Sequence, residues 1–191
     1  RVKPRCKYYG RCGGCQLQHA DYDLQLTLKA GIVRDAMIRL GGFDAKLFET
    51  LTCEPSPEFW GYRNKAAFPV QGLKGKIVTG FYRAGTHRLE LIRQCPVNAK
   101  RLNEIYGKIL DNLDKNKYPF DGYDEREGTG KLRHIIARTG INTGESLLSF
   151  VINGKMSAKS VKALVSLGNS ARPDTLTINH NSKPGNVILG T

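Results

Sequence analysis

The sequence lacks any long hydrophobic run. No apolar stretch approaches the roughly 18 residues that a membrane-spanning helix needs. A secretory leader core is also missing near Arg1. We therefore expect a cytoplasmic protein with no membrane partner. No internal repeat or low-complexity tract is visible, and a hydrophobic content of 40% is enough for a folded core.

Acidic residues are scarce. The chain has 17 Asp and Glu against 30 Lys and Arg, which leaves a net charge of +13 over 191 residues. The excess is uneven and gathers in residues 1–20, 60–101 and 131–191. Clustered positive charge of this kind is typical of proteins that bind a polyanion, most simply a nucleic acid. A basic, solvated face without a partner is the alternative.

Two chemical signatures are missing as well. The sequence has no Gly-rich strand-to-helix turn of the dinucleotide-binding type. It also has only one C-x2-C hook, formed by Cys12 and Cys15. What remains is a C-x5-C-x2-C cluster that starts at Cys6, and a remote Cys95 directly before Pro96. In a chain without an export signal, such spacing favours metal ligation over disulfides.

The nature of the metal centre is left open by the spacing. A structural zinc site usually pairs two C-x2-C hooks, whereas three nearby cysteines and a remote Cys-Pro are more typical of an iron–sulfur cluster. Redox thiols or coincidence are further alternatives. The fifth cysteine, Cys53, lies in a proline-marked link and matches no catalytic motif. We expect no chemistry from it.

Hydrophobic periodicity predicts an α+β fold. Leu24, Leu28, Ile32, Met37 and Leu40 recur at helical spacing and predict an amphipathic helix that Asp21 caps. The predicted helices are 21–40, 97–116 and 157–167, and the predicted strands are 66–70, 77–83, 89–93, 132–139, 146–153, 175–181 and 187–190. This order predicts a mainly antiparallel sheet with flanking helices, preceded by the N-terminal cysteine loop.

The chain divides into three predicted parts. Residues 1–20 form the cluster loop, 21–41 a linking helix, and 42–191 a central α+β RNA-binding domain. The sequence begins with Arg1 rather than Met and stops within an apolar segment. We therefore expect a piece of a larger protein, with the linking helix packed on a domain that lies outside this chain.

Several segments together resemble the RNA uracil-C5 methyltransferases. The resemblance covers essentially the whole chain, and its motifs occur in the family's order. They are Cys6-Lys7-Tyr8-Tyr9-Gly10-Arg11-Cys12-Gly13-Gly14-Cys15-Gln16-Leu17-Gln18-His19, Tyr62-Arg63-Asn64-Lys65-Ala66, Gly80-Phe81-Tyr82-Arg83 with His87, Cys95-Pro96-Val97, Arg133-His134 and Gly185-Asn186-Val187-Ile188-Leu189-Gly190.

The resemblance implies an S-adenosylmethionine-dependent enzyme that methylates uridine C5, most simply in 23S rRNA. In that family a cysteine attacks C6 of a base taken out of its stack. This chemistry belongs to a Rossmann-like domain that we expect to be absent here, so the fragment should be inactive. The resemblance also implies a 4Fe–4S cluster on Cys6, Cys12, Cys15 and Cys95, and a monomeric enzyme.

The matched motifs also supply candidate RNA contacts. Their donors suit phosphate and ribose oxygens. The alternative for each is a solvated surface or a salt bridge with Glu90, Glu125 or Glu127. The candidates are Arg63, Lys65, Arg83, His87, Arg133 and His134. Other interpretations of the chain are a tRNA uracil-C5 methyltransferase fragment, a non-enzymatic zinc-stabilised nucleic-acid-binding module and, more weakly, an electron-transfer protein.

Overall fold

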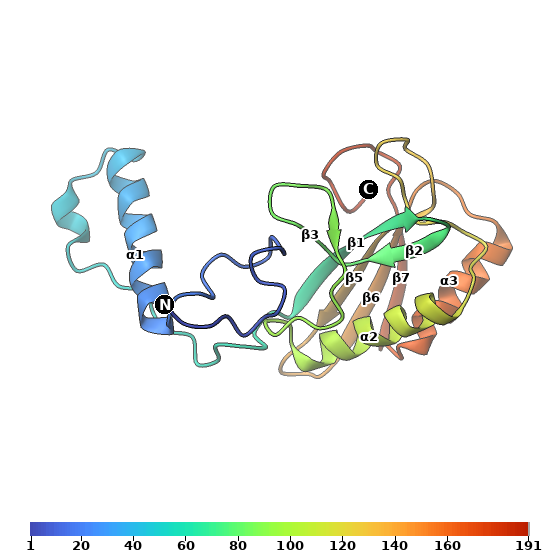
Figure 1. Cartoon of the computed structure of the whole chain (residues 1–191), viewed down its shortest axis with the longest axis horizontal. Coiled ribbons are helices and arrows are strands. Elements are labelled where there is room, and N and C mark those ends of the chain that lie inside the picture. The colour runs from blue at the N-terminus through green and yellow to red at the C-terminus, as the bar shows by residue number, and fades with distance from the viewer. Residues whose placement is uncertain (191) are drawn as a thin grey trace.

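A five-stranded sheet with the strand order β2-β1-β5-β6-β7 forms the centre of the fold. The computed structural model describes residues 1–190 (Figure 1). The strands of this sheet are β1 (Lys65–Leu73), β2 (Lys76–Thr79), β5 (Leu132–Thr139), β6 (Ser146–Ile152) and β7 (Thr175–His180). A separate two-stranded ribbon pairs β3 (Phe81–Tyr82) with β4 (Leu89–Glu90).

Strand pairing is mostly antiparallel. β1 pairs with β5 through residues 65–69 and changes its partner to β2 from Val70 onward. β5 and β6 match two of the predicted strands and form a hairpin. β6 continues through a helix into β7, which runs parallel to it. The expected α+β class is confirmed, with a mixed rather than purely antiparallel sheet. Within residues 1–190, β6 and β7 form the one parallel strand pair.

Two helices cover one face of the sheet. α2 (Lys100–Lys115) and α3 (Ala158–Ser170) place their apolar stripes against β1, β5 and β6. At the centre, the rings of Phe68 from β1 and Tyr106 from α2 stack with centroids 3.7 Å apart. Both side chains are almost fully buried. Hydrophobic burial between these layers is the main stabilising contribution to the fold.

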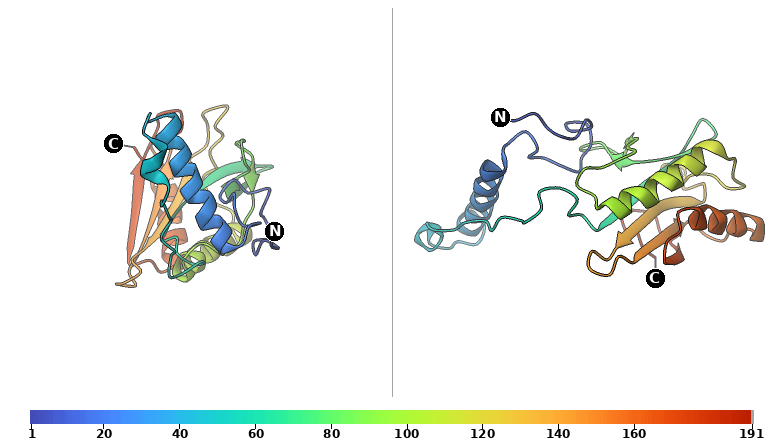
Figure 2. Two further views of the ribbon diagram at one scale, coloured as in Figure 1. Left: turned by 90° about the vertical axis from the view of Figure 1, so that its left-hand side faces the viewer. Right: turned by 90° about the horizontal axis from the view of Figure 1, so that it is seen from below.

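A helical arm projects from the sheet. It consists of α1 (Tyr22–Arg39) and the short 3₁₀ helix η1 (Ala45–Phe48), and Figure 2 shows both to one side of the sheet and its helices. Asp21 caps α1 as predicted, by accepting a hydrogen bond of 2.9 Å from the Leu24 amide. No residue of α1 is buried, and Leu24, Leu28, Ile32 and Leu40 of its predicted apolar face are exposed. None of the helices there is long and apolar enough to cross a bilayer.

Three predicted strands differ from the structure. The segment 89–93 forms a strand only at Leu89–Glu90. The segment 77–83 is divided at Gly80, where a Cβ would lie 2.1 Å from the Glu90 carbonyl oxygen. This close approach lets the chain leave the main sheet and form the β3–β4 ribbon. The segment 187–190 is not a strand. Side-chain amides of Asn179 and Asn181 bind its backbone groups in place of a neighbouring strand.

Candidate cluster site and nucleic-acid interface

Four cysteines line one cavity at the junction of the N-terminal loop and the sheet. Cys6, Cys12 and Cys15 come from the loop, and Cys95 comes from the segment before α2. The cavity is lined by these four cysteines together with Gly14, Gln18, Arg63, Phe81 and Ile92. Cys53 is not among the residues that line this cavity.

Backbone hydrogen bonds fix the cysteine loop on the β3–β4 ribbon. The Cys12 amide donates to the Tyr8 carbonyl at 2.9 Å and closes a tight turn. The next amide, of Gly13, donates to the Tyr82 carbonyl of β3 at 2.9 Å. A Cβ at Gly13 would lie 3.2 Å from that same carbonyl oxygen, so a residue without a side chain suits this close approach. The loop therefore holds its thiols against the ribbon.

Cys95 is held by a single side chain of α2. Asn103 accepts a hydrogen bond of 3.1 Å from the Cys95 amide and donates one of 3.0 Å to the Cys95 carbonyl. Burial is the main cause that raises the pKa of the Cys95 thiol, and burial likewise raises the pKa of Cys12. The positive charge of Arg63 acts in the opposite direction on both thiols. A bound cation would supply the further stabilisation that thiolates need here.

Glu90 links the cysteine loop to the ribbon electrostatically. Its buried carboxylate lies 3.0 Å from the Nη2 atom of Arg11 and 3.0 Å from the Nε atom of Arg83. The contact with Arg83 is an ion pair whose alignment falls short of a hydrogen bond. Glu90 is one of the salt-bridge partners expected for the candidate RNA contacts, and its pair with Arg83 confirms that alternative. It is the one acidic residue between Glu58 and Glu104.

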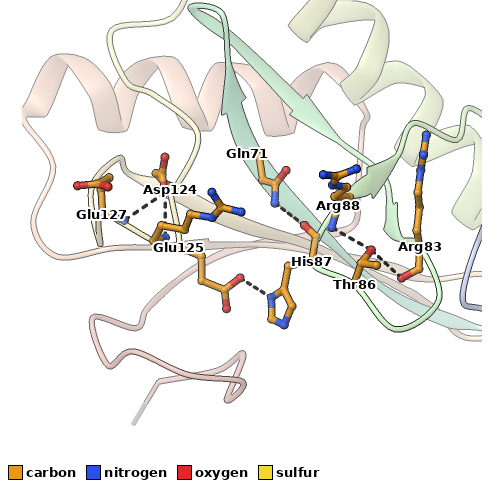
Figure 3. A network of polar contacts seen from close by, with 9 residues as sticks. Gln71, Arg83, Thr86, His87, Arg88, Asp124, Glu125 and Glu127 are labelled. Atoms are coloured by element: carbon orange, nitrogen blue, oxygen red, sulfur yellow. Dashed lines mark hydrogen bonds and ion pairs between the residues drawn. The ribbon is translucent and has the colours of Figure 1, made fainter.

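The other predicted RNA contacts occupy different environments. Arg63 lines the cysteine cavity, and Lys65 is exposed at the start of β1. Arg83 is exposed but is paired with Glu90. His87 is exposed, and its Nδ1 atom lies 2.6 Å from the Glu125 carboxylate (Figure 3).

A polar network surrounds His87. Its ring lies 5.2 Å from the ring of Tyr82, and its carbonyl accepts a hydrogen bond of 2.9 Å from the side chain of Gln71. The neighbouring Thr86 accepts a hydrogen bond from the Arg88 amide and donates one to the Arg83 carbonyl (Figure 3). These contacts order the β3–β4 turn, so His87 is presented at a defined position on the surface.

Arg133 is buried and bonded within the fold, and RNA contact by this residue stays a prediction. It is 4% exposed, and its Nη1 atom donates to the carbonyls of Asn181 and Lys183 at 2.6 and 2.8 Å. Its guanidinium also lies 4.6 Å from the centre of the Tyr123 ring. The pairing register of β5 with β6 shifts between Leu132 and His134, so Arg133 occupies an irregularity that changes the direction of its side chain. Its role is to hold the segment after β7.

His134 is half-buried and neutral at physiological pH. Burial, reinforced by the charge of Arg133, lowers the pKa of His134 to about 4, and Glu125 acts in the opposite direction. The Nδ1 atom of this imidazole is buried and has no hydrogen-bond partner among the described residues. His134 and His87 both line a cavity of about 270 Å³ beside Tyr82. RNA contact by His134 therefore remains a prediction for a neutral side chain.

Comparison with known proteins gives this geometry a context. Over 191 residues, which is the full length of the chain, the sequence is 36% identical to an uncharacterized RNA methyltransferase of Clostridium tetani. It is 42% identical over 155 residues, or 79% of the chain, to an uncharacterized RNA methyltransferase of Synechocystis. The matched relatives are RNA methyltransferases. No protein-family model matches the chain.

The chain is also similar to a solved structure, that of a uracil-C5 methyltransferase. The tRNA (uracil-54, C5)-methyltransferase of Pyrococcus abyssi, in complex with S-adenosyl-L-homocysteine, superposes on 94% of the chain with a TM-score of 0.66 and 26% identity. The chain spans 39% of that structure, and 40% and 32% of the Clostridium and Synechocystis relatives. The similarity to these RNA methyltransferases therefore concerns less than half of each relative.

Proposed function

We propose that this chain is the cluster-bearing, RNA-binding part of an S-adenosylmethionine-dependent RNA uracil-C5 methyltransferase. The observation that carries the proposal is the convergence of four cysteines on one cavity in a chain similar over its full length to RNA methyltransferases. The Pyrococcus enzyme supports uracil C5 as the modified position. S-adenosylmethionine would supply the methyl group, and we assign no residue in 1–190 to the transfer step.

We favour an iron–sulfur cluster over a single zinc ion, as the cysteine spacing and the motif resemblance imply. A tetrahedral zinc site would hold its four sulfurs about 3.8 Å apart, given a Zn–S distance of about 2.3 Å. Within residues 1–190, no three Cys, His, Asp or Glu side chains converge closely enough for one ion, although the four thiols line one cavity. A 4Fe–4S cluster binds each thiolate through a different iron and so suits a wider set.

The cluster would act as a structural clamp in this proposal. Cys6, Cys12 and Cys15 would hold its loop side, and Cys95 would hold the side next to α2. The basic N-terminal loop and the β3–β4 ribbon would then present one surface to RNA. Lys65, Arg83 and His87 are exposed on or next to this surface, and their donors suit phosphate oxygens.

The cluster is tested by purifying the chain without oxygen. We expect a brown protein with about four iron atoms per chain. Cys95→Ser should lose the colour and most of the iron, and the matched control Cys53→Ser should keep both, because Cys53 lies away from the cavity. A colourless chain with one zinc ion, or equal iron in the two variants, would contradict the cluster proposal.

The RNA target is tested by competition. We propose 23S rRNA as the substrate, as the motif resemblance implies, and the similarity to the Pyrococcus tRNA methyltransferase makes tRNA the second candidate. Binding of rRNA fragments and of tRNA by the purified chain can be compared at several salt concentrations, because phosphate contacts weaken steeply with salt. Preferential binding of tRNA would shift the assignment. Methyl transfer from labelled S-adenosylmethionine by the chain alone would refute its predicted inactivity.

A further inference from the structure

A second cavity lies beside the cysteine loop, between that loop, the start of α1 and the link 56–62. Its volume is about 510 Å³, within the range of small-molecule sites. Its wall includes four aromatic and three basic side chains: Tyr22, Phe59, Trp60, Tyr62, Lys3, Arg5 and Lys29. We propose that this cavity binds one unpaired nucleotide of the RNA. The inference rests on the proposed RNA-binding function and names a specific subsite for it.

The aromatic rings are positioned for stacking. Phe59 packs on Tyr22 with centroids 3.8 Å apart and ring planes at 19°, which fixes the orientation of the Phe59 ring. The Tyr22 hydroxyl also accepts a hydrogen bond of 2.8 Å from the Ser56 amide and so holds the link in place. Phe59 is nevertheless 49% exposed and Tyr62 is 51% exposed. Rigid, accessible rings of this kind stack readily on unpaired bases.

The basic side chains are available for a phosphate. Lys3, Arg5 and Lys29 form no ion pair with a carboxylate in the part of the chain that the structure describes. The guanidinium carbon of Arg5 lies 5.1 Å from the centre of the Trp60 ring. A guanidinium has five N–H donors and so can bind phosphate oxygens.

Two carboxylates also line the cavity, and their charge must be weighed against the three cations. Asp21 is engaged at the N-terminus of α1, where its Oδ1 atom accepts the Leu24 amide. Glu58 is exposed and remains as a second negative charge. The lining therefore keeps an excess of positive charge. Aromatic faces next to a cationic rim match a base with its phosphate better than they match a purely apolar protein segment.

The position of the cavity connects it to the cluster loop. Gly14 and Cys15 line both cavities, and Arg5 directly precedes Cys6. A loop clamped through its cysteines would hold Arg5 over Trp60, whereas a released loop would not. The cavity should therefore bind a nucleotide only while the loop is held in place.

Trp60 allows a direct test, because it is the one tryptophan of the sequence. Hexauridylate added to the full 191-residue chain should quench tryptophan emission in a saturable way, since a stacked base shields and quenches the indole. Ribose 5-phosphate, which has no base, should leave the emission unchanged. RNA binding is measured in parallel by the anisotropy of labelled hexauridylate.

Variants assign the binding to this cavity. Phe59→Ala should weaken hexauridylate binding about tenfold or more, given the usual contribution of one base–aromatic stack. The matched control Phe43→Ala should bind normally, because Phe43 is 48% exposed on the far part of the arm. Arg5→Ala should weaken binding and lower the salt dependence by about one phosphate contact. Lys46→Ala on η1 is its control.

The outcomes separate the two proposals. If RNA binds but the Trp60 emission does not respond and Phe59→Ala binds normally, this inference is overturned while the RNA-binding function stands. That result would assign the cavity to a protein segment instead. If hexauridylate and longer RNAs bind neither the wild-type chain nor the variants, both proposals fail. Circular dichroism of each variant distinguishes loss of binding from loss of folding.

Discussion

Protonation of His134 at acid pH should lower the free energy of unfolding. Replacing His134 with glutamine should remove most of this loss. The pKa of His134 is about 4 in the folded chain, against an ordinary value of 6.5. The folded state therefore resists protonation, while the unfolded chain takes up a proton from pH 6.5 downward. Stability that is fully present above pH 6.5 is lost as the pH falls toward 4.

The size of the loss follows from the two pKa values. Each unit of difference between the folded and unfolded pKa corresponds to about 1.4 kcal/mol. The full loss in the free energy of unfolding therefore approaches about 3 kcal/mol below pH 4. Between pH 7.5 and 5.0 the same linkage gives about 2 kcal/mol. Arg133 and Glu125 are the charged groups that act on the ring, and burial is the larger cause. Glutamine keeps a polar side chain but does not titrate.

Urea unfolding followed by circular dichroism, at both pH values, measures this difference. The wild-type chain should lose about 2 kcal/mol more than His134→Gln, since other titrating groups are common to both proteins. His180→Gln serves as the control, because His180 is exposed at the end of β7 and should behave as wild type. The iron content of each sample is recorded, so that cluster loss is not mistaken for titration. Equal losses in the wild type and His134→Gln would refute the reasoning.

Two further predictions concern packing and the ion pairs at the cysteine loop. Glu90→Gln should lower the free energy of unfolding by about 1–2 kcal/mol, because two arginines lose a charged partner but remain accessible to water. Urea unfolding measures this loss. An unchanged free energy of unfolding would contradict the role assigned to Glu90. Phe68→Ala should cost about 3–5 kcal/mol, because a buried ring stacked on Tyr106 is removed from the core. Thermal unfolding measures that loss. A variant as stable as wild type would show that neighbouring side chains fill the cavity left by the Phe68 ring.

Local patterns in the sequence predicted the regular elements well. The helix expected over 21–40 is observed as Tyr22–Arg39, and the hairpin strands 132–139 and 146–153 are observed as β5 and β6. Periodicity and capping act within a few residues of each other, so they are readable from the chain alone. Whether the apolar side chains of α1 are covered is a tertiary property, and periodicity could not predict their exposure.

The site was predictable only where spacing carries the information. The cysteine motif indicated which thiols would meet, and the structure brings all four to one cavity. The side-chain direction of Arg133 depends on an irregularity in strand pairing and on carbonyls about fifty residues away. The role of Glu90 likewise depends on Arg11, which is distant in sequence. Contacts of this kind leave no local signature.

The segment 187–190 also bears on how the sheet avoids self-association. β7 is an edge strand, and exposed edges tend to pair with the edges of other molecules. Asn179 and Asn181 bind backbone groups of Val187, Ile188 and Gly190 through their side-chain amides, so this segment covers part of the edge without joining the ladder. At the opposite edge β2 has only four residues. The β7 edge is thus partly masked, and β2 itself is too short to offer a long pairing surface to another molecule.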